Sequence, residues 1–226
     1  MVRRCDFLLA SLLLAAWPSC ASAQENVELS ANAGVVSDYR FRGISLSDRD
    51  PAVQGGVDVQ GEHFFVGTWA SSIAETGGAD VELDVYAGVN GSLGDISWTA
   101  AANAYLYPGG EGLNYVEFVA TGERSFGPVT FGIEAALAPT QANVDEANHY
   151  LGASSAMDAG GGWTLIARGG FEDGFYDSKW DWEIGARYTT GPCIASLSYV
   201  DTDYGGADEA GRLGKGGLVA SLLAEF

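Results

Sequence analysis

The sequence predicts an all-β fold, a transmembrane antiparallel up-and-down β-barrel of about twelve strands with short turns at one end and longer loops at the other. Three observations predict it. Apolar and polar residues alternate with period two along the chain, the connections alternate between short and long, and the chain ends in a two-faced strand that stops on Phe226. A soluble β-sandwich is the alternative for any one segment taken alone.

The alternating segments account for most of the chain. The clearest is 180–189, where Trp180, Trp182 and Ile184 share one face and mostly polar residues share the other. Segments 79–90 and 128–138 alternate in the same way. The expected strands are 27–39, 51–60, 63–71, 79–90, 95–106, 114–124, 128–138, 147–157, 162–170, 180–189, 192–201 and 217–226.

The connections between these segments are sorted by length. Short, glycine-containing turns occupy 61–62, 91–94, 125–127, 158–161 and 191–192. Longer polar connections occupy 40–50, 72–78, 107–113, 138–146, 172–179 and 202–216. Short periplasmic turns and long extracellular loops are typical of outer-membrane barrels, and closure removes the unpaired strand edges that hydrocarbon would penalise.

The two ends of the chain indicate export and membrane assembly. Arg3 and Arg4 precede an apolar run that ends at Trp17, and small residues follow at 21–23. That run is too short to span a bilayer core of roughly 30 Å. We expect a cleaved signal peptide at 1–23 and one outer-membrane barrel domain at 24–226. The outward face of the last strand and Phe226 are expected to be the assembly signal for the barrel-assembly machinery.

Composition narrows the class of protein. The chain of 226 residues has a formal net charge of −19 and is 47% hydrophobic. This charge argues against general nucleic-acid binding, and the hydrophobic content argues against disorder. Many aromatic residues fall near segment ends, which predicts interfacial girdles. They are Tyr39, Trp69, Tyr105, Tyr107, Tyr115, Tyr150, Trp163, Trp180, Trp182, Tyr188 and Tyr199.

If the apolar faces meet lipid, the opposite faces line the interior. The candidate lumen residues there are Glu28, Asp38, Asp58, Glu82, Asp84, Asn103, Glu134, Arg168, Glu183 and Arg187. Isolated charges in a dry core carry a large desolvation cost, so these groups are expected to be paired or wet. Acids outnumber bases, which favours cations if the lumen conducts. The alternative is a closed barrel whose interior ion pairs are structural.

The first long connection is locally basic in an acidic chain. Arg40, Arg42 and Arg49 lie within ten positions. Their guanidinium groups are candidates to pair with lumen acids and fold the loop inward as a constriction, or to bind an anionic ligand such as a lipopolysaccharide phosphate. The third interpretation is a set of structural salt bridges near the rim.

The same connection carries a family resemblance. The stretch Ser37-Asp38-Tyr39-Arg40-Phe41-Arg42-Gly43-Ile44-Ser45, followed by Pro51-Ala52-Val53-Gln54-Gly55-Gly56-Val57-Asp58, resembles the TorF-type porin family of Gram-negative bacteria. The resemblance extends over essentially the whole chain after the signal peptide. It implies a single outer-membrane barrel with channel activity, and it implies nothing about the solute.

Catalytic signals are weak. The chain has only two histidines, His63 after a short turn and His149 after a long loop, so the predicted topology puts them on opposite rims. The one arrangement worth testing is His149 with Asp145, Glu146 and Ser154. No phosphate-binding loop or His/Cys metal spacing is present in the sequence, so no enzyme activity, cofactor or metal is expected.

The expected function is therefore passive passage of small hydrophilic solutes or ions, with a preference for cations. Two other classes stay open. One is a non-conducting barrel whose extracellular loops bind a partner or lipopolysaccharide, and the other is a soluble periplasmic β-sandwich. The expected partners are outer-membrane lipids, lipopolysaccharide, the assembly machinery and small solutes.

Overall fold

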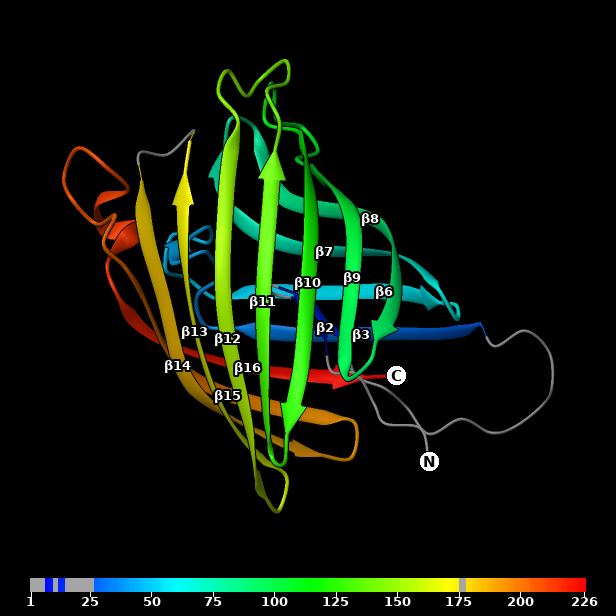
Figure 1. Ribbon diagram of the computed structural model, residues 1–226. Helices are drawn as coiled ribbons and strands as arrows, with labels where there is room; N and C mark the ends of the chain where they lie inside the picture. Colours follow the sequence, from blue (N-terminus) through cyan, green and yellow to red (C-terminus); the bar gives the residue numbers. More distant parts are fainter. Residues whose placement is uncertain (1–6, 10–11, 15–26, 175–177) are drawn as a thin grey trace.

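The computed structural model describes residues 7–9, 12–14, 27–174 and 178–226, and its main feature is one closed barrel (Figure 1). The twelve barrel strands are β3 (Glu28–Val36), β6 (Ala52–Gln60), β7 (Phe64–Thr76), β8 (Ala79–Leu93), β9 (Ile96–Leu106), β10 (Tyr115–Phe126), β11 (Val129–Ala138), β12 (Asn148–Gly160), β13 (Trp163–Asp173), β14 (Lys179–Thr190), β15 (Cys193–Thr202) and β16 (Gly217–Glu225).

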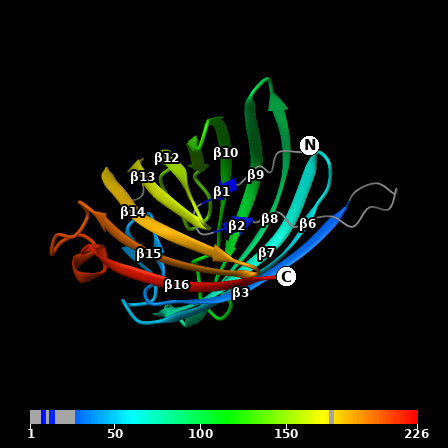
Figure 2. The same cartoon turned by 90° about the horizontal axis from the view of Figure 1, so that it is seen from below.

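Each barrel strand pairs antiparallel with its neighbours in sequence, and β16 pairs with β3 to close the sheet (Figures 1 and 2). After β16 ends, the backbones of Phe226 and Ala31 exchange two hydrogen bonds of 2.8 and 3.0 Å. The barrel therefore has no open edge, as a strand-built membrane span requires. The predicted all-β, twelve-stranded, up-and-down barrel is confirmed.

Among the described residues, four short strands and one turn of 3₁₀ helix lie outside the barrel sheet. β1 (Phe7–Leu9) pairs with β2 (Leu12–Leu14), and β4 (Arg40–Phe41) pairs with β5 (Ile44–Ser45). The 3₁₀ helix η1 (Gly211–Gly214) lies in the last long connection. Within the described part of the chain, no helix is both long and apolar enough to be a membrane span. The expected cleavage region at 21–23 lies outside the described residues, so the signal peptide stays a prediction.

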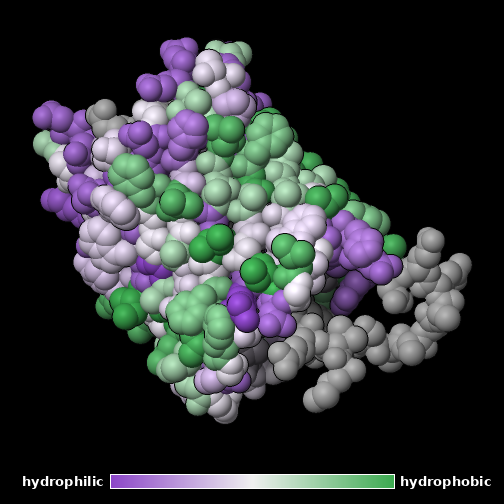
Figure 3. Space-filling view, in the orientation of Figure 1, coloured by the Kyte–Doolittle hydropathy of each residue, from purple (hydrophilic) through white to green (hydrophobic). Residues whose placement is uncertain are grey.

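Side chains alternate between the outside and the inside of the barrel. On β8, Val85 and Val89 are exposed on the outer wall, whereas Glu82, Asp84 and Tyr86 are buried inside. The outer face seen in Figure 3 carries hydrophobic residues over the strands and hydrophilic ones at the end with the longer loops. An apolar outer band around a polar interior is the architecture of a transmembrane β-barrel.

The loop pattern follows the prediction except at one connection. The segment 72–78, expected to be a long loop, is mostly strand, because β7 continues to Thr76 and pairs there with Ala79. Only Gly77 and Gly78 remain as a turn, and both have positive φ, which glycine adopts without strain. The longest connections are 37–51, which contains β4 and β5, and 203–216, which contains η1.

The predicted aromatic girdles are only partly correct. The outer wall does carry Trp163, Trp180, Trp182, Tyr188 and Tyr199, each at least one third exposed. Six others were placed wrongly and lie inside the barrel or against its interior: Tyr39, Trp69, Tyr105, Tyr107, Tyr115 and Tyr150. Position near a strand end does not decide the side of the wall. Strand parity decides it, because the inward aromatics lie on the same face as inward acids.

Candidate functional site

The interior has a packed side along β6–β9. A buried cluster there joins Val36, Phe65, Trp69 and Tyr86 to Tyr39 from the first long connection, which we call loop 1 (residues 37–51). The Tyr39 and Trp69 rings meet edge-on with centroids 5.3 Å apart. Such pairs add stabilisation beyond the area that they bury. This side of the lumen is filled by side chains.

Glycines on the neighbouring strands make room for the inward rings. A Cβ placed on Gly88 would lie 2.4 Å from the Phe65 ring and 2.6 Å from a backbone oxygen of Ala100. A Cβ on Gly67 would lie 2.5 Å from the Tyr86 ring. Each ring therefore lies across a position that only glycine can occupy without rearrangement. The need to make room for inward rings therefore explains why these strands contain glycine at these positions.

Loop 1 folds into the barrel as a small hairpin. β4 and β5 are joined by a two-residue turn, Arg42-Gly43, in which both residues have positive φ (45° and 86°). Such turns favour Asn-Gly, so arginine at the first position is strained. The surrounding structure must hold that conformation, and the contacts of the Arg42 side chain do so.

The Arg42 guanidinium is the centre of a buried ion cluster. It donates to Glu117 at 2.9 Å and to Glu172 at 2.8 Å, and it lies 3.9 Å from Glu134. Lys179 completes the cluster, because its Nζ lies 2.6 Å from Glu172 and donates to the Arg42 carbonyl at 2.8 Å. The side chains of Arg42, Glu117, Glu172 and Lys179 are each at most 3% exposed. We call these four residues the Arg42 latch.

The Arg42 latch ties loop 1 to three strands, β10, β13 and β14. The guanidinium also stacks over the rings of Phe41 and Tyr150, 4.7 and 4.1 Å from their centroids. Burial lowers the pKa of Arg42, but Glu117 and Glu172 more than offset burial and hold that pKa well above its ordinary value. Arg42 therefore keeps its charge, as its ion pairs require.

Tyr39 anchors the other side of loop 1. Its hydroxyl donates to Glu82 at 2.5 Å, and the hydroxyl of Tyr107 donates to the second oxygen of Glu82 at 2.8 Å. Burial, and next the carboxylates of Glu82 and Asp84, raise the pKa of Tyr39 well above its ordinary value. Tyr39 therefore stays protonated and continues to donate.

Arg40 and Arg49 close the upper part of the β16–β3 seam. The paired residues of these two strands end at Ser221 and Val36. Residues 217–220 of β16 therefore extend beyond the paired part of β3. Arg40 pairs with Asp38 at 2.7 Å and donates to the carbonyl of Lys215 at 2.9 Å. Arg49 donates to the same carbonyl at 2.6 Å. These side chains take the place of strand pairing along the seam.

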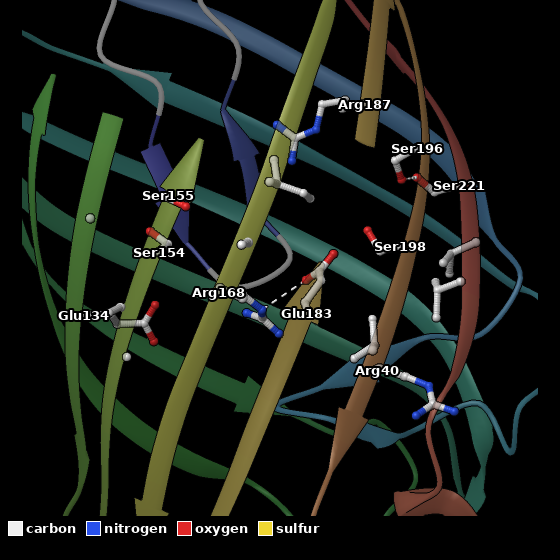
Figure 4. A pocket seen from close by; sticks show the side chains of 18 of the residues that line it. Arg40, Glu134, Ser154, Ser155, Arg168, Glu183, Arg187, Ser196, Ser198 and Ser221 are labelled. Atoms are coloured by element: carbon white, nitrogen blue, oxygen red, sulfur yellow. Dashed lines mark hydrogen bonds and ion pairs between the residues drawn. The ribbon is translucent and has the colours of Figure 1, made fainter. Parts of the chain in front are cut away.

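A cavity of about 210 Å³ lies on the other side of the lumen, against β10–β16 (Figure 4). On its wall Arg168 pairs with Glu183 at 3.1 Å, and Figure 4 shows Ser154 and Ser155 on the neighbouring strand β12, with Glu134 on β11 beyond it. Ser196 and Ser221 share a hydrogen bond of 2.6 Å further round the wall. The cavity reaches from Arg187 and Ile194 up to Asp38 and Arg40 of loop 1.

The predicted lumen residues do not all lie together. Glu28, at the start of β3, is exposed, whereas Asp38 and Asn103 are buried. Asp58, Glu82 and Asp84 lie on the packed side, where Asp58 accepts from Tyr86. Glu134, Arg168, Glu183 and Arg187 line the cavity. Arg42 joins the two sides through its latch, while Arg40 and Arg49 lie at the seam.

Sequence reasoning missed Glu117, Glu172 and Lys179. Glu172 and Lys179 were assigned to a loop, because the strands around 171–179 were predicted to be shorter than they are. Parity carried the missing signal, since Glu172 shares a face with Arg168, and Lys179 shares a face with Glu183.

The one catalytic arrangement considered from the sequence is not brought together. His149 is exposed on the outer wall, whereas Ser154 on the same strand lines the cavity. An odd separation along a strand puts two side chains on opposite faces. Among the described residues, no cluster of three or more His, Cys, Asp or Glu side chains is arranged to hold a metal ion.

A closed twelve-stranded barrel with an apolar outer band and a polar interior defines the chain as an outer-membrane β-barrel protein. By sequence, residues 20–221 match the model of the family described as "Bacterial protein of unknown function (Gcw_chp)". The chain belongs to that family. A comparison with curated proteins gives no match.

Solved structures of similar fold include porins and channels. The NanC porin aligns with a TM-score of 0.59 at 11% identity, covering 88% of this chain and 99% of its own. An outer-membrane channel from Pseudomonas putida F1 aligns with a TM-score of 0.51 at 11% identity, covering 92% and 100%. At these identities the likeness supports the barrel fold.

Proposed function

We propose that this protein is a porin-like outer-membrane channel for the passive diffusion of small hydrophilic solutes or ions, with a preference for cations. The observation that carries the proposal is the cavity along β10–β16, because it is lined by serines and charged side chains and extends to loop 1. The TorF-type porin resemblance and the porin folds among similar structures agree with it. No catalytic step is part of this function.

Loop 1 is the constriction in this proposal. The Arg42 latch holds it across the long-loop end, and removing one partner of a buried ion pair leaves an uncompensated charge. Arg42→Gln is therefore expected to loosen loop 1 and raise the single-channel conductance at least twofold in a planar bilayer. The matched control is Arg124→Gln, since Arg124 lies on the exposed short-turn rim, where its ion-pair partner is Asp95. Equal conductance in both variants and the wild type contradicts the constriction.

The cation preference rests on the charges that face the lumen. Glu123 and Glu134 line the cavity together with Arg168 and Arg187, while Glu82 and Asp84 lie on the packed side. A reversal potential measured for the refolded protein under a salt gradient tests this balance. A potential of the sign expected for cations supports it, and an anion-selective potential contradicts it.

The second candidate is a non-conducting scaffold whose extracellular loops bind a partner or lipopolysaccharide. The observation that favours it is the depth of burial of the Arg42 latch, which closes part of the lumen. Verified insertion without discrete current steps supports the scaffold and contradicts the channel.

We also propose that the carboxyl-terminal strand is the signal for barrel assembly. Leu218 and Leu222 on the outer face of β16, and Phe226 directly after its end, are each more than half exposed. Phe226→Ser is expected to lower the yield of assembled barrel in outer-membrane fractions, with Leu151→Ser on β12 as a control for lost apolar surface. Equal yields for the two variants contradict a specific terminal signal.

A further inference from the structure

The β16–β3 seam has the shortest paired stretch in the barrel wall. β16 and β3 pair over five residues each, from Ser221 and Val36 to Glu225 and Asn32. Every other pair of neighbouring strands in the described barrel pairs over at least seven residues. Backbone hydrogen bonds between strands hold a barrel wall closed. The wall is therefore most weakly held at this seam.

Side chains of loop 1 close the long-loop end of the seam. In the described chain, the backbone pairing ends with a hydrogen bond of 2.8 Å from Ser37 to the Ala220 carbonyl. Beyond it, Arg40 and Arg49 donate to the carbonyl of Lys215 at 2.9 and 2.6 Å. Arg49 also donates to two further carbonyls of the last long connection. Two guanidinium groups thus stand where a strand ladder would continue.

This closure can open without stranding a charge. When its bond to Lys215 breaks, Arg40 keeps the Asp38 carboxylate at 2.7 Å and the Gly43 carbonyl at 3.1 Å, both within loop 1. Arg49 is partly exposed, so water can solvate its guanidinium. A side chain moves by changing rotamer, whereas a ladder opens only when several backbone bonds break together. The long-loop end of the seam is therefore the place where the wall parts most easily.

The cavity lies behind this end of the seam, and its wall there is neutral. Val36, Val200 and Val219 line it, and the register places Ser198 beside Val219 and Ser221 beside Val36. The described residues of β3, β15 and β16 contribute no charged side chain to the cavity lining. The seam side of the cavity therefore offers aliphatic surface and serine hydroxyls, which both donate and accept hydrogen bonds.

Apolar side chains also lie on the lipid side of the seam. Leu218 and Leu222 on β16 and Val35 on β3 are each more than half exposed on the outer wall. A molecule that passes the seam thus moves between two apolar surfaces. An apolar body suits both of them, whereas a formal charge would lose its solvation on the lipid side.

We propose that the long-loop end of the β16–β3 seam is a lateral gate through which small uncharged amphiphiles, such as medium-chain alcohols, pass between the cavity and the outer leaflet of the membrane. In the cavity the alkyl chain lies against Val36, Val200 and Val219, and the hydroxyl bonds to Ser198 or Ser221. The gate opens when the loop 1 arginines leave the carbonyls of the last long connection. This route runs through the wall, so it goes beyond the proposed channel along the barrel axis and does not depend on conduction.

The test locks the seam with a disulfide in a Cys193→Ser background. The seam pair is Ser37→Cys with Ala220→Cys, two exposed positions that face each other where the backbone pairing ends. Facing Cα atoms on antiparallel strands lie about 4.5–5.5 Å apart, a span that a disulfide bridges. The control pair is Val35→Cys with Val53→Cys, which face each other on the outer side of β3 and β6.

The probe is a decanol that carries a photoreactive diazirine, dissolved in the lipid vesicles that hold the refolded protein. Mass spectrometry after illumination locates the labelled residues. The reduced seam pair is expected to be labelled at inward Val200 and Val219 as well as at outward Leu218. Oxidation of the seam pair is expected to lower the inward labelling at least fivefold and to leave the outward labelling unchanged. Oxidation of the control pair is expected to change neither.

Two results overturn the proposal. One is equal inward labelling in the oxidised and the reduced seam pair, and the other is labelling of outward residues alone in the reduced protein. The single-channel conductance of the same variants separates the gate from the channel. A conducting barrel whose inward labelling ignores the disulfide contradicts the gate and supports the channel. Inward labelling that the disulfide suppresses, in a barrel without current, does the reverse.

Discussion

The β6–β9 wall and the β10–β16 wall are built from the same alternating strands, yet one side of the lumen is filled and the other is hollow. On the filled side the inward positions carry large rings, such as Phe65 and Trp69, packed with Tyr39 of loop 1. On the hollow side they carry glycine and serine beside a few charges, as at Gly132 and Ser154. Strand number sets the width of a barrel, and the size of the inward side chains decides how much of that width stays open.

The largest expected effect comes from removing a ring on the filled side. Trp69→Ala deletes a buried indole that packs on Tyr39, so it is expected to lower the free energy of unfolding by about 3–5 kcal/mol. Trp180→Ala is the matched change on the outer wall, where lipid fills the vacated space and the loss is smaller. Urea unfolding in lipid vesicles measures both. Equal losses contradict a packed interior on this side.

Replacing a glycine is expected to have a smaller effect on stability, and that effect should differ between the filled and the hollow side. Gly88→Ala forces a methyl group against the Phe65 ring and the Ala100 carbonyl, which is expected to lower the free energy of unfolding by about 1–3 kcal/mol. Gly132→Ala meets only a serine hydroxyl within 3 Å, and that hydroxyl can rotate away. The same unfolding assay should find Gly132→Ala within about 0.5 kcal/mol of the wild type. The reverse order of the two losses contradicts the filled and hollow sides.

The smallest expected effect concerns selectivity. Glu134→Gln removes one negative charge from the hollow side and is expected to lower the cation-to-anion permeability ratio by roughly twofold. Glu62→Gln is the control, because the Glu62 side chain is 86% exposed on the short-turn rim. Reversal potentials under the same salt gradient compare the two variants. An unchanged ratio in Glu134→Gln shows that ions do not pass along this wall.

The sequence predicted the strands well and one connection badly. Period-two alternation found all twelve barrel strands to within a few residues, because lipid outside and a polar interior impose that pattern on every strand. The connection at 72–78 was wrong, since its polar residues resemble a loop although Thr76 and Ala79 still pair. Polarity does not distinguish a loop from a strand end that extends beyond the hydrocarbon.

The filled side was predictable in part. Tyr105 shares a face with Asn103, and Tyr150 shares a face with Asn148, so parity would have placed these rings inside. The glycines that receive the inward rings lie on neighbouring strands, and their register is set only when the barrel forms. Sequence spacing carries no direct record of that register.

The Arg42 latch was the least predictable part of the site. The local excess of arginine in loop 1 indicated a role for Arg42, but its partners lie 75 and 130 positions away at Glu117 and Glu172. The closed barrel brings these positions together at its long-loop end. A single sequence gives the charges of such a cluster and does not pair them.

The central claim is that solutes pass along the hollow side of the lumen. The most direct test is the single-channel conductance of Ser154→Trp, which puts an indole into the cavity, compared with Leu151→Trp, which puts the same ring on the lipid-facing side of β12. We predict that Ser154→Trp at least halves the conductance, while Leu151→Trp keeps the wild-type value. Wild-type conductance in a correctly folded Ser154→Trp barrel would contradict the claim.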